Sequence, residues 1–236
     1  MTFWDTLDRL YCGPAPLPDA LAGAWNLDPA LLAGLALLAF ALRGSRAGLV
    51  GVAVLVLAFV SPLCALSSAL FSARVVHHVL LVAVAAPLLA QAWPGRAARG
   101  PTVPLLVATA TLWAWHLPAA YDAALSNVAV YWGMQLSLLV TSVWFWRAAL
   151  HFDTPPVHAT LAILGAWMQM GLLGALLTFA PDALYAAHQS APLAWGLSPL
   201  ADQQLGGLLM WVPAGLPYAL FGARAGLAAW RRTAPA

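Results

Sequence analysis

Residues 70–93, LFSARVVHHVLLVAVAAPLLAQAW, form the most informative stretch of the chain. As an α-helix this stretch would cross about one membrane thickness, and its first third carries Arg74, His77 and His78. Imidazoles are costly inside hydrocarbon, so they usually face the interior of a helix bundle and serve a site there. Arg74 and His78 are four residues apart and share a helix face, and His77 lies on the adjacent stripe. We therefore expect a polar site at the depth of the two histidines.

The composition argues against a soluble protein. Of the 236 residues, 63% are hydrophobic and 8% are charged, and the mean hydropathy is +0.83. Soluble domains carry about 25% charged residues, so this chain could not cover itself with a water-compatible surface. We expect an all-α, polytopic membrane helix bundle without a soluble domain of useful size and without nucleic-acid binding. We also expect no signal peptide, because residues 1–28 lack a basic region followed by an apolar one.

The apolar segments predict seven membrane-spanning helices. They cover residues 28–42, 48–63, 70–93, 103–115, 128–146, 157–179 and 200–221. Asp28 and Pro29 read as an N-cap and first-turn pair that starts the first span, and Pro87 is expected to kink the third. Residues 3–11 predict a short amphipathic helix lying in the membrane interface. The chain therefore divides into an interfacial helix and linker over 1–27 and a seven-helix transmembrane domain over 28–236.

The arginines predict the orientation of the bundle. If the N-terminus is outside, eight of the ten basic residues lie on the inner side, namely Arg43, Arg46, Arg96, Arg99, Arg147, Arg224, Arg231 and Arg232. Arg9 and Arg74 remain on the outer side, and Asp153 is the only acidic residue inside. Cytoplasmic loops are enriched in arginine and lysine, so the N-terminus is expected outside and the C-terminus inside.

With that topology, several polar residues fall at one depth near the outer surface. His77 and His78 begin the third helix, His116 ends the fourth, His188 lies between the sixth and seventh, and Asp202 opens the seventh. Imidazoles suit copper, zinc or haem iron, and thioethers favour Cu(I). Met210 lies eight residues after Asp202, about 12 Å deeper at the helical rise. The predicted metal ligands are His77, His78, His116, His188, Asp202 and Met210, whereas His151 and His158 are expected to be ordinary interfacial residues.

Each of these residues also has a structural interpretation. A histidine can hydrogen-bond a backbone carbonyl and tighten helix packing, and methionine in an apolar helix is often filler. Asp202 can cap its helix, since carboxylates favour helix N-termini, or Arg74 can neutralise it in competition with a metal. Gly206 and Gly207 most simply permit close helix contact.

The two cysteines leave three alternatives. Cys12 and Cys64 both lie on the outer side, where disulfides can persist. They could form a disulfide, or a thiolate could assist at the metal site. We expect two unrelated, buried free thiols.

Three segments resemble the CtaG-type cytochrome c oxidase assembly factor family of bacterial membrane proteins. They are SPLCALSSALFSARVVHHVLLVAVAAPLLA at 61–90, WHLPAAYDAAL at 115–125, and LYAAHQ at 184–189 followed by PLADQQLGGLLMWVP at 199–213. The resemblance covers most of the chain from the second helix onward. It implies a role in maturing a haem-copper oxidase, with His78, His116, Tyr121, Asp202 and Gln203 matching the family pattern.

The sequence also departs from that pattern at the start of the third helix. Many members read His-Met-x-x-His there, whereas this chain has Arg74 and Val75 at the first two positions. A His-Met pair would suit Cu(I), so its replacement weakens the case for copper on this helix. His77, where the family often has glutamine, is a partial replacement.

The sequence thus predicts a non-enzymatic assembly factor in the bacterial inner membrane. Its outer-facing pocket would bind copper transiently and pass it to an oxidase subunit, with membrane lipid and a periplasmic copper carrier as further partners. One alternative is a haem-binding electron carrier or quinol-reactive subunit, because histidines on two helices can be axial ligands. The other is a metal-free scaffold that binds the oxidase through its helices.

Overall fold

The computed structural model describes residues 11–93 and 100–233, apart from the side chains of residues 228, 229, 232 and 233. Every regular element in these ranges is helical. In chain order they are η1 (Leu21–Gly23), α2 (Pro29–Ala41), α3 (Arg46–Phe59), α4 (Leu63–Ala69), α5 (Phe71–Val79), η2 (Leu80–Ala85), α6 (Ala86–Ala92), α7 (Thr102–Trp115), α8 (Pro118–Ser126), α9 (Val128–Leu150), α10 (Pro156–Thr178), η3 (Ala186–His188), η4 (Ala191–Trp195), α11 (Pro199–Trp211) and α12 (Gly215–Thr233). The all-α prediction is confirmed. The predicted interfacial helix over 3–11 lies outside the described residues except for Tyr11.

Length and composition make the chain a multi-pass membrane protein. Four stretches are long and apolar enough to cross a membrane: Phe71–Ala92, Val128–Leu150, Pro156–Thr178 and Pro199–Leu227. Two bent pairs, α3 with α4 (45°) and α7 with α8 (74°), raise the number of candidate spans in the described chain to six. The segment predicted as the first span is α2, whose 13 residues reach about 20 Å at the helical rise. It is therefore short of the roughly 30 Å hydrocarbon layer.

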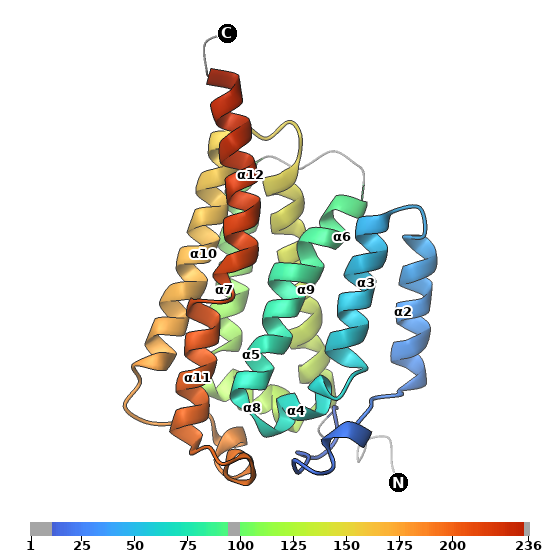
Figure 1. Ribbon diagram of the computed structural model, residues 1–236, viewed down its shortest axis with the longest axis vertical. Coiled ribbons are helices and arrows are strands. Elements are labelled where there is room, and N and C mark those ends of the chain that lie inside the picture. Colours follow the sequence, from blue (N-terminus) through green and yellow to red (C-terminus); the bar gives the residue numbers. More distant parts are fainter. Residues whose placement is uncertain (1–10, 94–99, 234–236) are drawn as a thin grey trace.

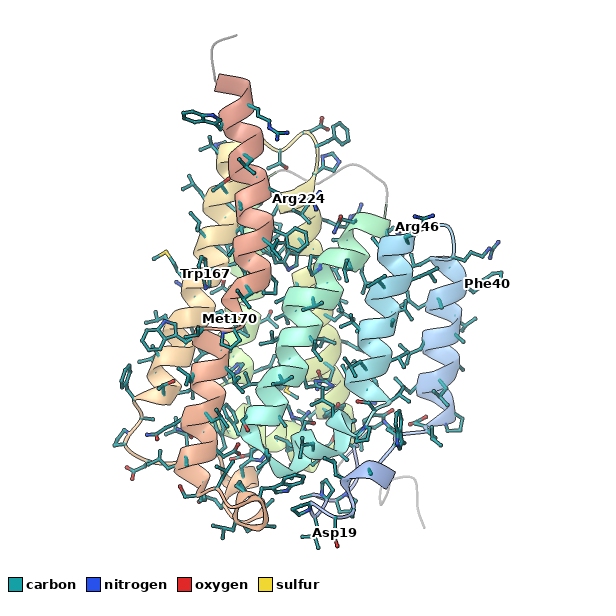
Figure 2. The ribbon with its side chains drawn as sticks, viewed as in Figure 1. Asp19, Phe40, Arg46, Trp167, Met170 and Arg224 are labelled. Carbon is teal, nitrogen blue, oxygen red and sulfur yellow. A yellow bond between two sulfur atoms is a disulfide. The ribbon has the colours of Figure 1, made fainter. Side chains whose placement is uncertain are left out.

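The helices run roughly side by side, with α2 and α3 at one edge and α10 with α12 at the other (Figure 1). The central column is α5, η2 and α6, and α4 and α8 lie across the end of the bundle at which α5 and α11 begin (Figure 1). Arg46 and Arg224 lie toward the end opposite Asp19 (Figure 2).

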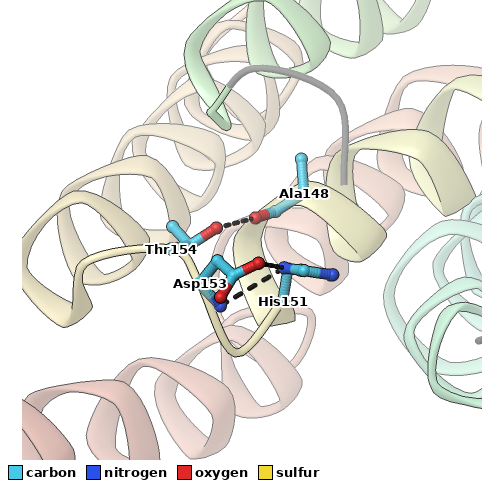
Figure 3. A network of polar contacts seen from close by, with 4 residues as sticks. All are labelled: Ala148, His151, Asp153 and Thr154. Carbon is cyan, nitrogen blue, oxygen red and sulfur yellow. Dashed lines mark hydrogen bonds and ion pairs between the residues drawn. The ribbon is translucent and has the colours of Figure 1, made fainter. Parts of the chain in front are cut away.

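Helix starts follow local capping chemistry. The Asp28 carboxylate accepts hydrogen bonds from the backbone nitrogens of Ala30 (2.7 Å) and Leu31 (3.2 Å), and Pro29 occupies the first turn, as the sequence predicts. Local hydrogen bonds also hold the connection between α9 and α10. Thr154 donates to the Ala148 carbonyl at 2.7 Å, and the Asp153 backbone nitrogen donates to His151 Nδ1 at 3.3 Å (Figure 3).

The central helix widens in its middle instead of kinking sharply. Residues Leu80–Ala85 adopt a π-helical turn that ends two residues before Pro87, and the whole stretch Phe71–Ala92 continues as one span. Proline has no N–H to donate to the carbonyl four residues earlier, and its ring would clash with that carbonyl. The wider π turn accommodates both effects. The indole of Trp146 donates to the Val82 carbonyl at 2.8 Å and thus satisfies one acceptor of the widened turn.

Two adjacent glycines bring α11 into close contact with both neighbours. A Cβ at Gly206 would lie 2.5 Å from the Phe71 ring on α5, and one at Gly207 would lie 2.6 Å from the Gly174 carbonyl on α10. Only glycine leaves room for backbones this close. The expectation that Gly206 and Gly207 permit close helix packing is confirmed.

The expectation of two free thiols is wrong. Cys12 and Cys64 form a disulfide, which joins the linker before α2 to helix α4. The hydroxyl of Tyr131 lies 3.4 Å from the Cys12 sulfur. Since a disulfide sulfur carries no proton, this hydroxyl is the donor. The linker and α4 are 52 residues apart in sequence, and no local pattern links them.

Candidate metal site

His78 and His116 meet at the centre of the candidate site. His78 comes from α5 and His116 from the C-cap of α7, and their ring centroids are 6.3 Å apart at an angle of 75°. Both side chains are buried. His116 Nδ1 donates to the Leu112 carbonyl at 2.7 Å, which orients the ring and leaves Nε2 as the lone-pair nitrogen. Neither ring nitrogen of His78 has a hydrogen-bond partner within the described chain.

His77 lies beside His78 but faces another part of the bundle. Its ring is fully buried and makes an edge contact with Phe59 of α3 at a centroid distance of 4.8 Å. The centroid of the His78 ring is 5.8 Å away. Among the described residues, no hydrogen-bond partner reaches either nitrogen of His77. Four imidazole nitrogens on α5 are therefore buried without a hydrogen-bond partner in the described structure. Such unpaired buried polar atoms are rare in native proteins, because each one costs free energy.

His188 has both ring nitrogens engaged. Its Nδ1 lies 3.3 Å from the Ala69 carbonyl and must carry the proton, so Nε2 accepts from the Tyr121 hydroxyl at 2.8 Å. Burial and, to a lesser extent, the positive charge of Arg74 lower the pKa of His188 to about 4. His188 is therefore a neutral structural link between α8 and the end of α4.

Asp202 caps a helix other than its own. Its carboxylate accepts hydrogen bonds from the backbone nitrogens of Phe71 (2.6 Å) and Ser72 (3.1 Å) and from the Ser72 hydroxyl (2.5 Å). The N-cap residue of α5, Leu70, is extended and has an apolar side chain that cannot accept these bonds. A carboxylate at a helix N-terminus also interacts favourably with the helix dipole. Asp202 thus serves the capping role that the sequence left open, but on α5 instead of α11.

Arg74 is buried close to the histidines and is not neutralised by Asp202. Its Nε donates to the Ser67 carbonyl at 3.2 Å, and its guanidinium carbon lies 5.4 Å from the centre of the Tyr131 ring. Its Nη1 has no hydrogen-bond partner in the described parts of the chain, and no ion pair there includes Arg74. The alternative in which Arg74 pairs with Asp202 is therefore not formed.

Met210 and Gln203 have structural roles: Met210 packs against α10, and Gln203 bonds to the connection between α10 and α11. The Met210 Cβ lies 3.2 Å from where a Cβ at Gly174 would be, so Met210 packs against α10. Gln203 accepts from the Leu184 backbone nitrogen at 2.7 Å and donates to the carbonyls of Leu177 and Asp182. These bonds hold the α10–α11 connection over the end of the bundle.

Tyr185 is a site residue that sequence reasoning did not single out. Its hydroxyl donates to the backbone carbonyl of His116 at 3.0 Å, and its ring stacks on Phe71 at 4.7 Å. It thereby joins the His78–His116 pair to the Asp202–Phe71 contact. The sequence feature that could have identified Tyr185 is its position three residues before His188 in the LYAAHQ segment.

The six predicted ligands do not form one coordination sphere. In the described parts of the chain, no group of three or more His, Cys, Asp or Glu side chains is placed to hold a metal ion. The structure brings His78 and His116 together and places His77 next to them. His188 and Asp202 lie around the start of α5 with structural partners of their own, and metal ligation by any single one of the six residues stays a prediction.

A comparison with known protein families gives a match over most of the chain. The sequence model of the cytochrome c oxidase caa3 assembly factor family (Caa3_CtaG) matches residues 42–100 and 95–233. These ranges include α5, α7 and α11, which carry His78, His116 and Asp202. No curated protein and no solved structure matches the chain.

Proposed function

The chain belongs to the cytochrome c oxidase caa3 assembly factor family, and we propose that it carries a single Cu(I) ion between His78 and His116 for that oxidase. The family is one of assembly factors and not of enzymes, and it implies association with cytochrome c oxidase. Copper is here the cargo and not a resident cofactor. The proposed site lies on the outer side of the bacterial inner membrane, where a periplasmic copper carrier would load it and an oxidase subunit would receive the ion.

One observation carries this proposal: the ring of His78, whose nitrogens have no partner in the described chain, lies 6.3 Å from the oriented imidazole of His116. Buried polar groups in proteins are nearly always hydrogen-bonded, so the bare His78 ring indicates a missing partner. Ligand nitrogens lie about 2.0 Å from a bound metal, and two rings whose centroids are 6.3 Å apart leave room for one ion between them. The hydrogen bond from His116 Nδ1 to Leu112 is the kind of second contact that orients metal-binding histidines.

The donor set suits a carrier. Two neutral imidazoles form an incomplete coordination sphere that a receiving protein can complete and remove. The positive charge of Arg74, four residues before His78 on the same helix face, opposes a bound cation and favours release. Uptake should weaken in acid, because the imidazole ligands must be deprotonated to bind the ion.

The test compares copper binding and oxidase assembly in matched variants. His78→Leu combined with His116→Leu should abolish Cu(I) binding by the purified protein and lower oxidase activity in membranes. His158→Leu, on an exposed residue at the start of α10, is the control and should change neither. Equal copper binding, or normal oxidase activity, in the double variant would contradict the proposal. A Soret band that the double variant loses would instead support the haem alternative.

A metal-free scaffold is the second candidate, and two observations favour it. The described chain has no group of three acidic, cysteine or histidine side chains suited to a metal, and Arg74 places a buried positive charge on α5. Under this alternative the His78–His116 double variant would still co-purify with the oxidase and support its assembly.

A further inference from the structure

A groove on the side of the bundle formed by α2, α3 and α9 contains neither His78 nor His116 in its lining. It has a volume of about 350 Å³, within the range of small-molecule sites. Helix α2 packs mainly along α3 and stands at the edge of the bundle (Figure 1). Side chains of both α2 and α9 therefore border this space, and it remains open as a groove. Most of its lining is aliphatic, as expected for a groove that receives an apolar chain.

One polar side chain interrupts this apolar lining. Gln135 belongs to the stripe of α9 that lines the groove, together with Trp132, Leu136 and Leu139. It is 1% exposed. Its amide interacts with the Tyr131 hydroxyl, and its amide oxygen has no hydrogen-bond partner in the described structure. It lies about 10 Å along α9 from the helix start at Val128. Leaving a buried amide oxygen unpaired is costly, so a ligand that donates a hydrogen bond to this oxygen would gain affinity.

The charges around the groove select the kind of ligand. None of the described lining residues is Arg, Lys or His, so the groove offers no cation to a phosphate headgroup. Its one charged residue, Asp28, is occupied by the Tyr11 hydroxyl at 3.1 Å and by the first backbone nitrogens of α2. An anionic phospholipid headgroup would meet this carboxylate. An uncharged headgroup would not be repelled.

Flat aromatic surfaces lie beside the amide. Phe59 of α3 and Trp132 of α9 both line the groove and stack at 5.5 Å with planes 19° apart. Aromatic faces favour offset contact with another planar ring. The amide of Gln135 can donate to a ring carbonyl or accept from a ring hydroxyl.

We propose that this groove binds an isoprenoid quinone or quinol, with the ring beside Gln135 and the tail along α2. The three features select this class together: an apolar channel for the tail, no cation for a phosphate, and a neutral amide next to aromatic faces for an uncharged ring. This site is independent of the copper proposal, because no residue of the His78–His116 pair lines the groove.

The first test removes the amide and keeps the shape of the site. Purified protein in nanodiscs is titrated with decylubiquinone and with a short-tailed naphthoquinone. Gln135→Leu should weaken binding about tenfold, the loss expected for one buried hydrogen bond. Gln91→Leu is the matched control, because Gln91 lies on α6 and donates to the Pro87 carbonyl away from the groove. Equal affinity in the Gln135→Leu and wild-type proteins would overturn the proposal.

The second test blocks the groove without disturbing the fold. Gly34 of α2 lines the groove, and a Cβ placed there meets no atom within 4 Å. Gly34→Leu should therefore fold normally and lose quinone binding, with copper binding unchanged. Lipid extraction of the wild-type protein should yield a quinone that Gly34→Leu lacks. Recovery of phospholipid alone, or the same quinone content in Gly34→Leu, would contradict the inference.

Discussion

Asp202 Oδ2 lies 2.6 Å from the backbone nitrogen of Phe71, although the two residues are 131 positions apart. This contact connects the first turn of α11 to the first turn of α5. It places the His77–His78 pair at a defined height relative to the α10–α11 connection. The start of the central helix is therefore determined by a side chain from the last third of the sequence.

Removing this carboxylate should destabilise the bundle. Asp202→Ala leaves the backbone nitrogens of Phe71 and Ser72 unpaired, and we expect a loss of about 3 kcal/mol in the free energy of unfolding. Asp153→Ala is the control, since the Asp153 side chain is 70% exposed and should cost less than about 0.5 kcal/mol. Denaturant titration in detergent measures both. If Asp202→Ala lost copper but kept full stability, Asp202 would be a ligand and not a cap.

His188 should make stability fall in acid. Its folded pKa is about 4, below the unfolded value near 6.5, so the unfolded state binds more protons between these pH values. Stability therefore decreases as the pH is lowered from 6.5 toward 4, by about 3 kcal/mol in total. Thermal unfolding at pH 7.5 and at pH 5 measures the slope. His188→Gln should have a smaller difference between the two conditions, and an unchanged difference would exclude His188 as the source.

Gly206 should not tolerate a methyl group. In Gly206→Ala the new Cβ would lie 2.5 Å from the Phe71 ring, which is itself buried and stacked on Tyr185. Such overpacking costs about 2 kcal/mol. Gly133→Ala on α9 meets no atom within 4 Å and should stabilise by about 0.5 kcal/mol through helix propensity. Melting temperatures of the two variants should move in opposite directions.

Trp146 should support the widened turn of the central helix. Trp146→Phe keeps most of the buried ring but removes the 2.8 Å hydrogen bond to the Val82 carbonyl. The expected loss is about 1–2 kcal/mol. Amide hydrogen exchange at residues 80–86 should accelerate in this variant more than exchange in α10. Uniform acceleration along the chain would indicate a general packing defect instead.

Arg74 should limit the affinity for copper if the proposed site is correct. Arg74→Met removes a buried positive charge four residues from His78 and keeps an apolar side chain of similar length. We expect Cu(I) to bind at least about tenfold more tightly, because the charge repulsion is removed. Competition with a chromophoric copper chelator measures the change. Unchanged or weaker binding would show that the guanidinium does not act on a metal between His78 and His116.

Much of the fold was predictable because it depends on local chemistry. A continuous apolar run must form its backbone hydrogen bonds internally, so each predicted span is helical. Asp28 and Pro29 start α2 through bonds within one turn, and Gly206–Gly207 is recognisable as a contact for helix backbones. The candidate histidines could be named for the same reason, since an imidazole inside an apolar segment is unusual wherever it points.

Long-range pairing determined the rest. Nothing near Cys12 in the sequence indicates Cys64, nothing near Asp202 indicates the start of α5, and nothing near Val82 indicates the indole of Trp146. These partners lie 52, 131 and 64 residues apart, and they meet only when the helices pack. Periodicity and capping therefore determine which residues form helices. Which polar groups find partners, and which, like those of His77, His78 and Gln135, do not, depends on how the packed helices face one another.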